Sequence, residues 1–147
     1  MRLLPFLMIL AVSPFALPLE AAMAETIISR KDPSEKLDKL FVALKKSKSE
    51  LIANDLADEI KSSWLESGSA NIDLMMQWAQ AAMDENKNQA ALDWLDQVVT
   101  LKPDYAEGWN RRATVHFLMN NYAKSMADIE KTLELEPRHF GALSGMG

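Results

Sequence analysis

The chain has no cysteine, only five glycines and only two histidines, and each shortage excludes a class of structure or chemistry. Without cysteine there is no disulfide and no lipid attachment through a thiol, so apolar packing alone has to stabilise the fold. The glycines form no phosphate-binding loop. We interpret His116 as a packing residue and His139 as a solvated turn residue, because neither has a second converging ligand. The sequence therefore predicts a protein that is not an enzyme and binds no cofactor or metal.

Charge of one sign is not concentrated anywhere in the chain. The net charge is −5, charged residues make up 25% of the sequence, and acidic and basic residues are interspersed. A nucleic acid or an anionic membrane needs a basic face, so neither is expected as a partner. No stretch alternates polar and apolar residues over a useful length, so we expect no strand and an all-α fold.

The beginning of the chain has the three parts of a secretory signal peptide. Arg2 precedes an apolar stretch at 3–19, and Ala22-Met23-Ala24 gives a small-residue cleavage site before Glu25. We expect residues 1–24 to be removed, which predicts a periplasmic or secreted protein with no membrane contact after cleavage. The alternative is an anchor formed by an uncleaved N-terminal segment. Three prolines interrupt the apolar stretch and no basic cluster follows it, which favours cleavage.

A flexible lead is expected at 25–31, followed at 32–71 by an N-terminal helical hairpin and a linker. Residues 32–35 read Asp-Pro-Ser-Glu, a helix start with a cap and an early proline. Residues 47–50 form a second capping box, which predicts another helix after a tight turn. The hairpin is either a degenerate repeat or a cap. Small and polar residues at 67–71 predict the linker.

Two prolines, Pro103 and Pro137, stand 34 residues apart, and each closes a helical segment. This period predicts stacked units at 72–105 and 106–139. The first unit should hold helices at about 73–84 and 89–101. In the second unit, the first helix should begin at a capping box at 104–107 and end at about 119, and the second helix should run from about 122 to 136. When the units are aligned, large residues fall near large ones and small near small: Trp109 on Met75, Ala113 on Ala79, Ser125 on Ala91 and Ile129 on Leu95.

This pattern resembles the tetratricopeptide repeat, whose signature is W-x2-L-G-x2-Y, then A-x3-F, then a proline. Trp109 and Pro137 match it, and Ala113, Ser125 and Ile129 replace the Gly, Ala and Phe, whereas Arg112 and His116 depart from the Leu and Tyr. The resemblance implies an α-solenoid of antiparallel helix pairs with about two full repeats. We expect the small residues to mark close approaches of helices, and Trp78, Trp94, Trp109 and Leu95 to fill the space between successive pairs.

A third unit starts at Phe140 and is truncated, at 140–147. A short first helix without a second helix to cover it would be marginal in water. We therefore favour a fragment of a longer protein, the alternative being a partial turn that caps the array.

In the tetratricopeptide family the first helices of successive repeats line a concave groove that binds peptides or helices of other proteins. The resemblance assigns this groove to ten positions: Asp73, Met76, Gln77, Gln80, Met83, Glu107, Asn110, Arg111, Thr114 and Phe117. Their amides, arginine and apolar side chains suit a peptide backbone and its side chains. The alternative is that these are merely exposed helix residues. The lysine and asparagine clamp that some members use for a terminal carboxylate is not reproduced.

The sequence therefore predicts an exported scaffold for protein–protein interaction, with another protein or peptide as its partner. One alternative is the docking domain of a larger enzyme whose catalytic part lies beyond residue 147. Another is a structural adaptor that self-associates through its ends.

Overall fold

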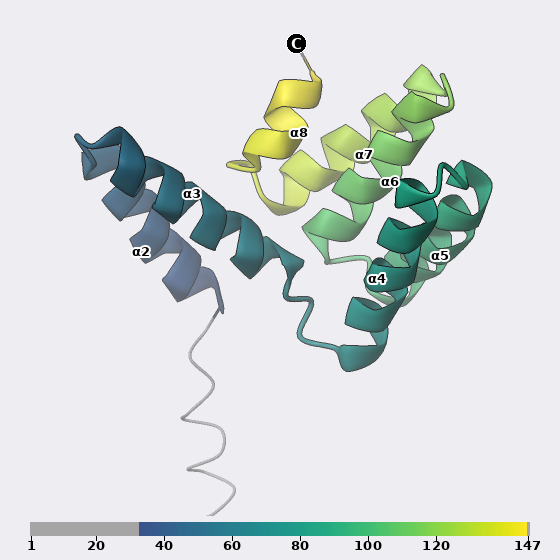
Figure 1. Ribbon diagram of the computed structural model, residues 1–147, viewed down its shortest axis with the longest axis horizontal. Helices are drawn as coiled ribbons and strands as arrows, with labels where there is room; N and C mark the ends of the chain where they lie inside the picture. Colours follow the sequence, from purple (N-terminus) through teal and green to yellow (C-terminus); the bar gives the residue numbers. More distant parts are fainter. Residues whose placement is uncertain (1–32, 147) are drawn as a thin grey trace, which may run out of the picture. The chain divides into compact units, whose positions relative to one another are not determined.

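The computed structural model describes residues 33–146 (Figure 1). The predicted signal peptide, the lead at 25–31 and the cap residue Asp32 lie outside the described residues. The chain divides into two compact units, Met1–Lys36 and Leu37–Gly147. Of the first unit, only residues 33–36, the beginning of one helix, belong to the described part.

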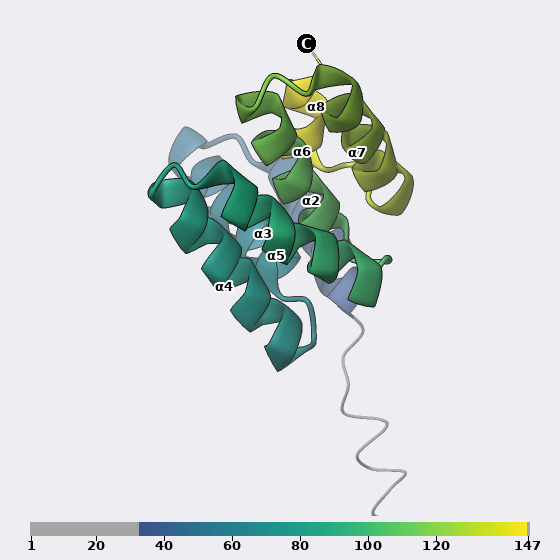
Figure 2. The same ribbon diagram turned by 90° about the vertical axis from the view of Figure 1, so that its right-hand side faces the viewer.

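Seven helices and no strand occupy the described residues, which confirms the all-α fold. In chain order they are α2 (Pro33–Lys46), α3 (Glu50–Leu65), α4 (Ala70–Asp84), α5 (Asn88–Leu101), α6 (Ala106–Leu118), α7 (Tyr122–Leu135) and α8 (Phe140–Gly145). Each helix from α4 to α8 packs on the next, as Figures 1 and 2 show for the pairs α4–α5 and α6–α7. This succession of helix pairs is the predicted solenoid.

The same turn joins the two helices of each pair. Asn86 and Asn120 both adopt a left-handed backbone, with φ of 58° and 59°. Asparagine tolerates this region because its side chain can bond locally, so it ends a helix much as glycine does. The two residues stand 34 positions apart, the period found in the sequence (120 − 86 = 34).

Small side chains lie where helices approach each other most closely. Ala79 and Ala91 are fully buried between α4 and α5, and Ala113 and Ser125 are each 3% exposed between α6 and α7. The Ser125 hydroxyl donates to the carbonyl of Ala113 at 2.9 Å, which satisfies a buried polar atom. A Cβ on Gly108 would lie 2.8 Å from a methyl of Val98, so α6 also approaches α5 too closely for a side chain there.

The sequence predicted that the tryptophans fill the space between successive helix pairs, and this is wrong for Trp78 and Trp94. Trp78 and Trp94 contact each other within the α4–α5 pair, with ring centroids 4.6 Å apart, and Trp78 is 43% exposed. Trp109 donates its indole N–H to the carbonyl of Pro103 at 3.0 Å. The residues that join the α4–α5 pair to α6 are instead Tyr105 and Val115, which share one apolar cluster with Leu95.

Three local predictions also need correction. The N-cap residue of α3 is Ser49, and no side chain caps this helix; the Ser47 hydroxyl donates instead to the Ser49 carbonyl at 3.0 Å, so the predicted capping box does not form. α6 begins after Tyr105 without a side-chain cap, since Asp104 pairs with Lys102 and Glu107 turns inward.

α4 begins three residues earlier than expected, at Ala70 and not at Asp73. The Asp73 carboxylate accepts bonds from the hydroxyl and amide of Ser67, at 2.5 and 3.0 Å, and so closes the linker against the first turn of α4. A helix start that depends on such a side-chain bond is not visible in the hydrophobic period.

The close approach of α6 and α7 gives a test of the repeat register, that is, of which residues face each other in this helix pair. Ala113→Leu should lower the free energy of unfolding by about 1–3 kcal/mol, because added methylenes overpack a filled site. Urea unfolding followed by circular dichroism measures this loss. Ala123→Leu, at an exposed position of α7, should leave stability nearly unchanged; equal behaviour of the two variants would contradict the assigned register.

Candidate partner-binding surface

The ten predicted groove residues come from α4 and α6, and the structure places them at three depths. Gln77, Thr114 and Phe117 are exposed, whereas Met76 and Glu107 are buried at 6% and 8% exposure. The remaining five are half-buried: Asp73, Gln80, Met83, Asn110 and Arg111. Use of the groove by a partner stays a prediction, but its surface is smaller than the set of ten.

The α4 members take part mainly in packing. Met76 belongs to the central apolar cluster, Met83 packs against it, and Asp73 closes the linker. Gln80 accepts a hydrogen bond from the guanidinium of Arg111 and donates to Asp84 at 2.7 Å. It therefore ties α4 to α6. On α4, only Gln77 among these residues is left as an exposed side chain.

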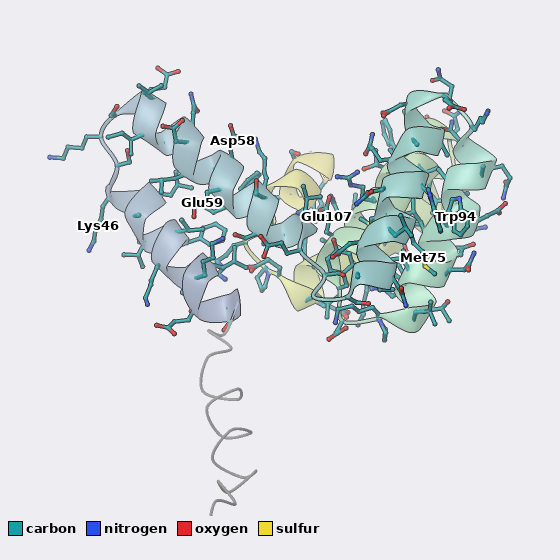
Figure 3. The ribbon with its side chains drawn as sticks, turned by 60° about the horizontal axis from the view of Figure 1, so that its bottom comes forward. Lys46, Asp58, Glu59, Met75, Trp94 and Glu107 are labelled. Carbon is teal, nitrogen blue, oxygen red and sulfur yellow. The ribbon has the colours of Figure 1, made fainter. Side chains whose placement is uncertain are left out.

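Glu107 is the centre of a buried polar network at the start of α6 (Figure 3). Its carboxylate accepts from the Arg111 Nε and the Asn110 amide, both at 2.9 Å, and lies 3.1 Å from the His139 Nε2. Burial raises the pKa of Glu107, but the hydrogen bonds from His139 and Arg111 and the positive charge of Arg111 outweigh it, so the pKa lies below its ordinary value. The carboxylate is thus held ionised.

The prediction that His139 is a solvated turn residue is wrong. It is 2% exposed and stacks on Trp64, with ring centroids 4.1 Å apart and planes inclined by 18°. Both ring nitrogens have partners, because Nδ1 accepts the backbone N–H of Ala142 at 3.2 Å and Nε2 faces Glu107. Since Nδ1 is an acceptor, the proton lies on Nε2 and is donated to the carboxylate. A histidine with both nitrogens paired is buried without an unsatisfied polar atom.

His116 is the packing residue that the sequence predicted, at 7% exposure. Burial, together with the positive charges of Arg112 and Lys124, holds the pKa of His116 below its ordinary value despite the nearby Asp128. Arg112 departs from the repeat signature for a structural reason. It forms a two-pronged ion pair with the buried Asp128, at 2.7 and 2.8 Å.

A hollow of about 510 Å³ lies between α6, α7 and α8, and we call it the large hollow. Three predicted groove residues line it: Asn110, Thr114 and Phe117. Seven further lining residues were not among the predicted groove positions. Ala113 comes from the buried side of α6, Ser125 and Ile129 come from α7, and Gly141, Ala142, Ser144 and Gly145 come from α8. Apart from Ile129 these residues are small, and a run of small residues at repeat spacing was the signal that could have identified them. The floor is apolar and the margin carries an amide and hydroxyl groups.

A second hollow, of about 280 Å³, lies on the other side of Asn110, and we call it the small hollow. Glu107, Asn110 and Arg111 line it from α6, and residues of α3 and of the α8 start close it: Lys61, Trp64, Leu65, His139, Phe140 and Gly141. Asn110 is therefore shared by both hollows.

Comparison with known proteins bears on this architecture. The tetratricopeptide repeat family matches residues 106–139. A TPR repeat-containing protein of Rhizobium etli is 52% identical over 148 residues, covering 98% of this chain and 72% of that protein. The chain belongs to the tetratricopeptide repeat family. Membership of this family implies a general role in protein–protein interaction, since such repeats are interaction scaffolds.

Two more distant relatives match about half of the chain. The Protein SGT1 homolog of Homo sapiens is 39% identical over 70 residues, or 48% of this chain and 19% of that protein. The Bos taurus homolog is 41% identical over 66 residues, covering 45% and 20%. The chain thus spans about a fifth of these two relatives. No solved structure matches the chain.

None of the helices described is long and apolar enough to cross a membrane. The described part of the chain contains no group of three or more metal-ligating side chains.

The buried carboxylate gives a prediction on pH. Because the pKa of Glu107 is lowered in the fold, its contribution to stability is present above the ordinary value of 4.5 and is lost as pH falls through the folded value. Glu107→Gln should be less stable than wild type at pH 7, and its free energy of unfolding should fall less between pH 6 and pH 3. Urea unfolding across this range measures both effects.

Glu130→Gln is the matched control, since Glu130 is an exposed carboxylate on α7. It should keep the wild-type dependence on pH. The assignment fails if Glu107→Gln and wild type lose stability in parallel as the pH falls.

Proposed function

We propose that this chain is an exported tetratricopeptide scaffold that binds a segment of another protein in the large hollow. The observation that supports the proposal is the convergence of Asn110, Thr114 and Phe117 on one concave surface with an apolar floor. Concave surfaces of this size with few convergent polar groups are typical binding sites.

The chemistry of the large hollow fits an apolar side chain on a peptide. Ala113, Ile129 and Ala142 form an apolar cluster beneath it. The Asn110 amide nitrogen donates to Glu107, and the hydroxyls of Thr114 and Ser144 donate to the carbonyls of Asn110 and Gly141. The oxygens of these three side chains can still accept hydrogen bonds from the N–H groups of a peptide backbone. The floor then accepts the side chain and the margin fixes the backbone.

An aromatic pair stands at one edge of the large hollow. Phe117 is 59% exposed and meets Tyr122 edge to face, with centroids 5.5 Å apart. Exposed aromatic residues beside a pocket supply rigid contact area at low entropic cost and are frequent hot spots of interfaces. We expect Phe117 to contribute more to binding than its neighbours.

The charges near the large hollow favour an uncharged partner segment. Arg111 is paired with Glu107 at 2.9 Å and is 21% exposed, so it offers little free positive charge. A terminal carboxylate would need an unpaired cation in the groove. The proposed partner motif is therefore apolar and internal to its chain, not an acidic tail.

Self-association is the second candidate, and exposed apolar side chains on the hairpin favour it. Leu51, Ile52 and Val42 are 72%, 54% and 53% exposed. Light scattering over a concentration series tests it, since a mass that stays monomeric at high concentration removes this candidate. The docking domain of a larger enzyme stays a further alternative without an observation of its own.

The partner surface can be tested by substitution. Phe117→Ala should weaken binding of a purified partner about tenfold, because it removes about 1.4 kcal/mol or more of hot-spot contact. The partner is first isolated from envelope extract on the mature protein and then titrated by calorimetry. Asn110→Ala should weaken binding to a smaller extent.

Leu101→Ala is the control, since Leu101 is 64% exposed on α5 and lies outside the large hollow. It should bind as wild type does. If Phe117→Ala binds with unchanged affinity and the melting temperature is also unchanged, the large hollow is not the binding site.

Export gives an independent prediction. Expression in a bacterial host should yield a protein that begins at Glu25 and lies in the soluble periplasmic fraction, because Ala22-Met23-Ala24 fits the signal peptidase. Mass spectrometry of the N-terminus measures this. An intact Met1 in the membrane fraction would support the anchored alternative.

A further inference from the structure

The end of α3 lies against the same part of α6 that carries the predicted groove residues (Figure 1). Lys61, Trp64 and Leu65 close the small hollow opposite Glu107, Asn110 and Arg111. A tetratricopeptide partner that extends from the large hollow past Asn110 would therefore meet α3. The N-terminal hairpin α2–α3 occupies the place into which such a partner would extend.

Trp64 is the main contact between the hairpin and the array. It is 8% exposed, stacks on His139 at 4.1 Å and meets the ring of Phe140 at 4.7 Å. Lys61, one turn earlier, places its ammonium 5.9 Å from the Phe140 ring centroid. An aromatic side chain enclosed by other rings, with a cation beside it, is typical of an anchor in a protein interface.

α2 contributes a weaker contact between the hairpin and the array. Arg138 donates to Asp38 at 2.6 Å and lies over the ring of Phe41 at 4.3 Å. Its side chain is 40% exposed and that of Asp38 is 66% exposed, so solvent screens the pair and it adds little to the docking energy. Trp64 therefore carries most of the attachment.

The hairpin has an apolar core of its own. Leu40 and Ile60 are buried with Trp64, and partly buried side chains of α2 and α3 surround them: Leu37, Phe41, Leu44 and Leu56. Phe140 is the member of this cluster that the array supplies. The two clusters of the repeats contain no residue of α2 or α3. The hairpin and the array therefore have largely separate cores, and the rings of His139 and Phe140 around Trp64 form the main apolar contact between them.

The link between them suits a hinge. Gly68 has φ of 76°, and a Cβ there would meet nothing within 4 Å, whereas the neighbouring Ser67 is bonded to Asp73, so Gly68 is the position at which the linker can turn. A hydrogen bond from the Tyr105 hydroxyl to the Leu65 carbonyl, at 2.9 Å, holds the docked end of α3. Hinges are commonly a few residues of this kind between rigid elements.

We infer that the hairpin α2–α3 is a releasable arm, held by Trp64, that covers the Glu107–Arg111 end of the binding surface. A partner confined to the large hollow binds with the arm docked, and a longer partner has to displace Trp64. The consequence for binding rests on the proposed function, whereas the release of the arm is a property of the chain alone and is tested without a partner.

The test measures distances between nitroxide spin labels by pulsed electron double resonance. The chain has no cysteine, so two introduced thiols are its only labelling sites. One pair, Leu51→Cys with Leu101→Cys, joins the hairpin to the array at positions 72% and 64% exposed. A second pair, Gln77→Cys with Lys124→Cys, lies at exposed sites within the array.

In the wild-type background both pairs should give one narrow distance. Trp64→Ala should abolish the narrow distance of the first pair and replace it with a broad distribution, while the second pair stays narrow. Val42→Ala, at a 53% exposed site of the same hairpin, is the control variant and should change neither pair.

Two results would overturn the inference. If the first pair keeps its narrow distance in Trp64→Ala, Trp64 does not hold the arm. If both pairs broaden together, the hairpin is an integral part of the array and not an arm. Neither result bears on whether Phe117 binds a partner, so the two proposals fail separately.

Discussion

The repeat array depends on helices that approach each other at positions with almost no side chain. Ala79 faces Ala91 in one pair, and Ala113 faces Ser125 in the next, all buried. Gly108 lets α6 approach α5 to a distance that excludes even a methyl group. Because packed interiors leave no spare volume, these contacts fix the crossing of each pair, and they thereby set where the side chains of α6 point. α7 and α8 also contact α6 through small residues. Because these side chains leave space between the three helices, the large hollow forms there.

Much of the fold could be predicted from the sequence because its signals are local. Helix periodicity and the 34-residue step gave α5 and α7 to within one residue at each end. The errors lie where a distant group changes a local preference. Glu107 occupies a capping position by sequence, but in the interior Arg111 and His139 both bond its carboxylate, and the Arg111 bond also joins two opposite charges. His139 follows a proline turn, and only the fold brings Trp64 to cover it.

The proposed binding surface was less predictable than the fold for a related reason. Register along a helix tells which residues share a face, and it placed Asn110, Thr114 and Phe117 together, as they are in the large hollow. It does not tell whether a neighbouring element covers that face. Met76 and Glu107 lie in register with the exposed residues, yet the central apolar cluster encloses Met76 and the His139 turn encloses Glu107.

The long-range contact of Arg138 with Asp38 has a consequence for the order of folding. The two residues are 100 positions apart, whereas each repeat pair is formed by neighbours in the chain. Closing a long loop costs more conformational entropy than closing a short one, and local contacts form faster. During synthesis the hairpin emerges before the array, but the ring on which Trp64 stacks belongs to residue 139. The segment made earlier therefore reaches its final position late, after the repeats have assembled.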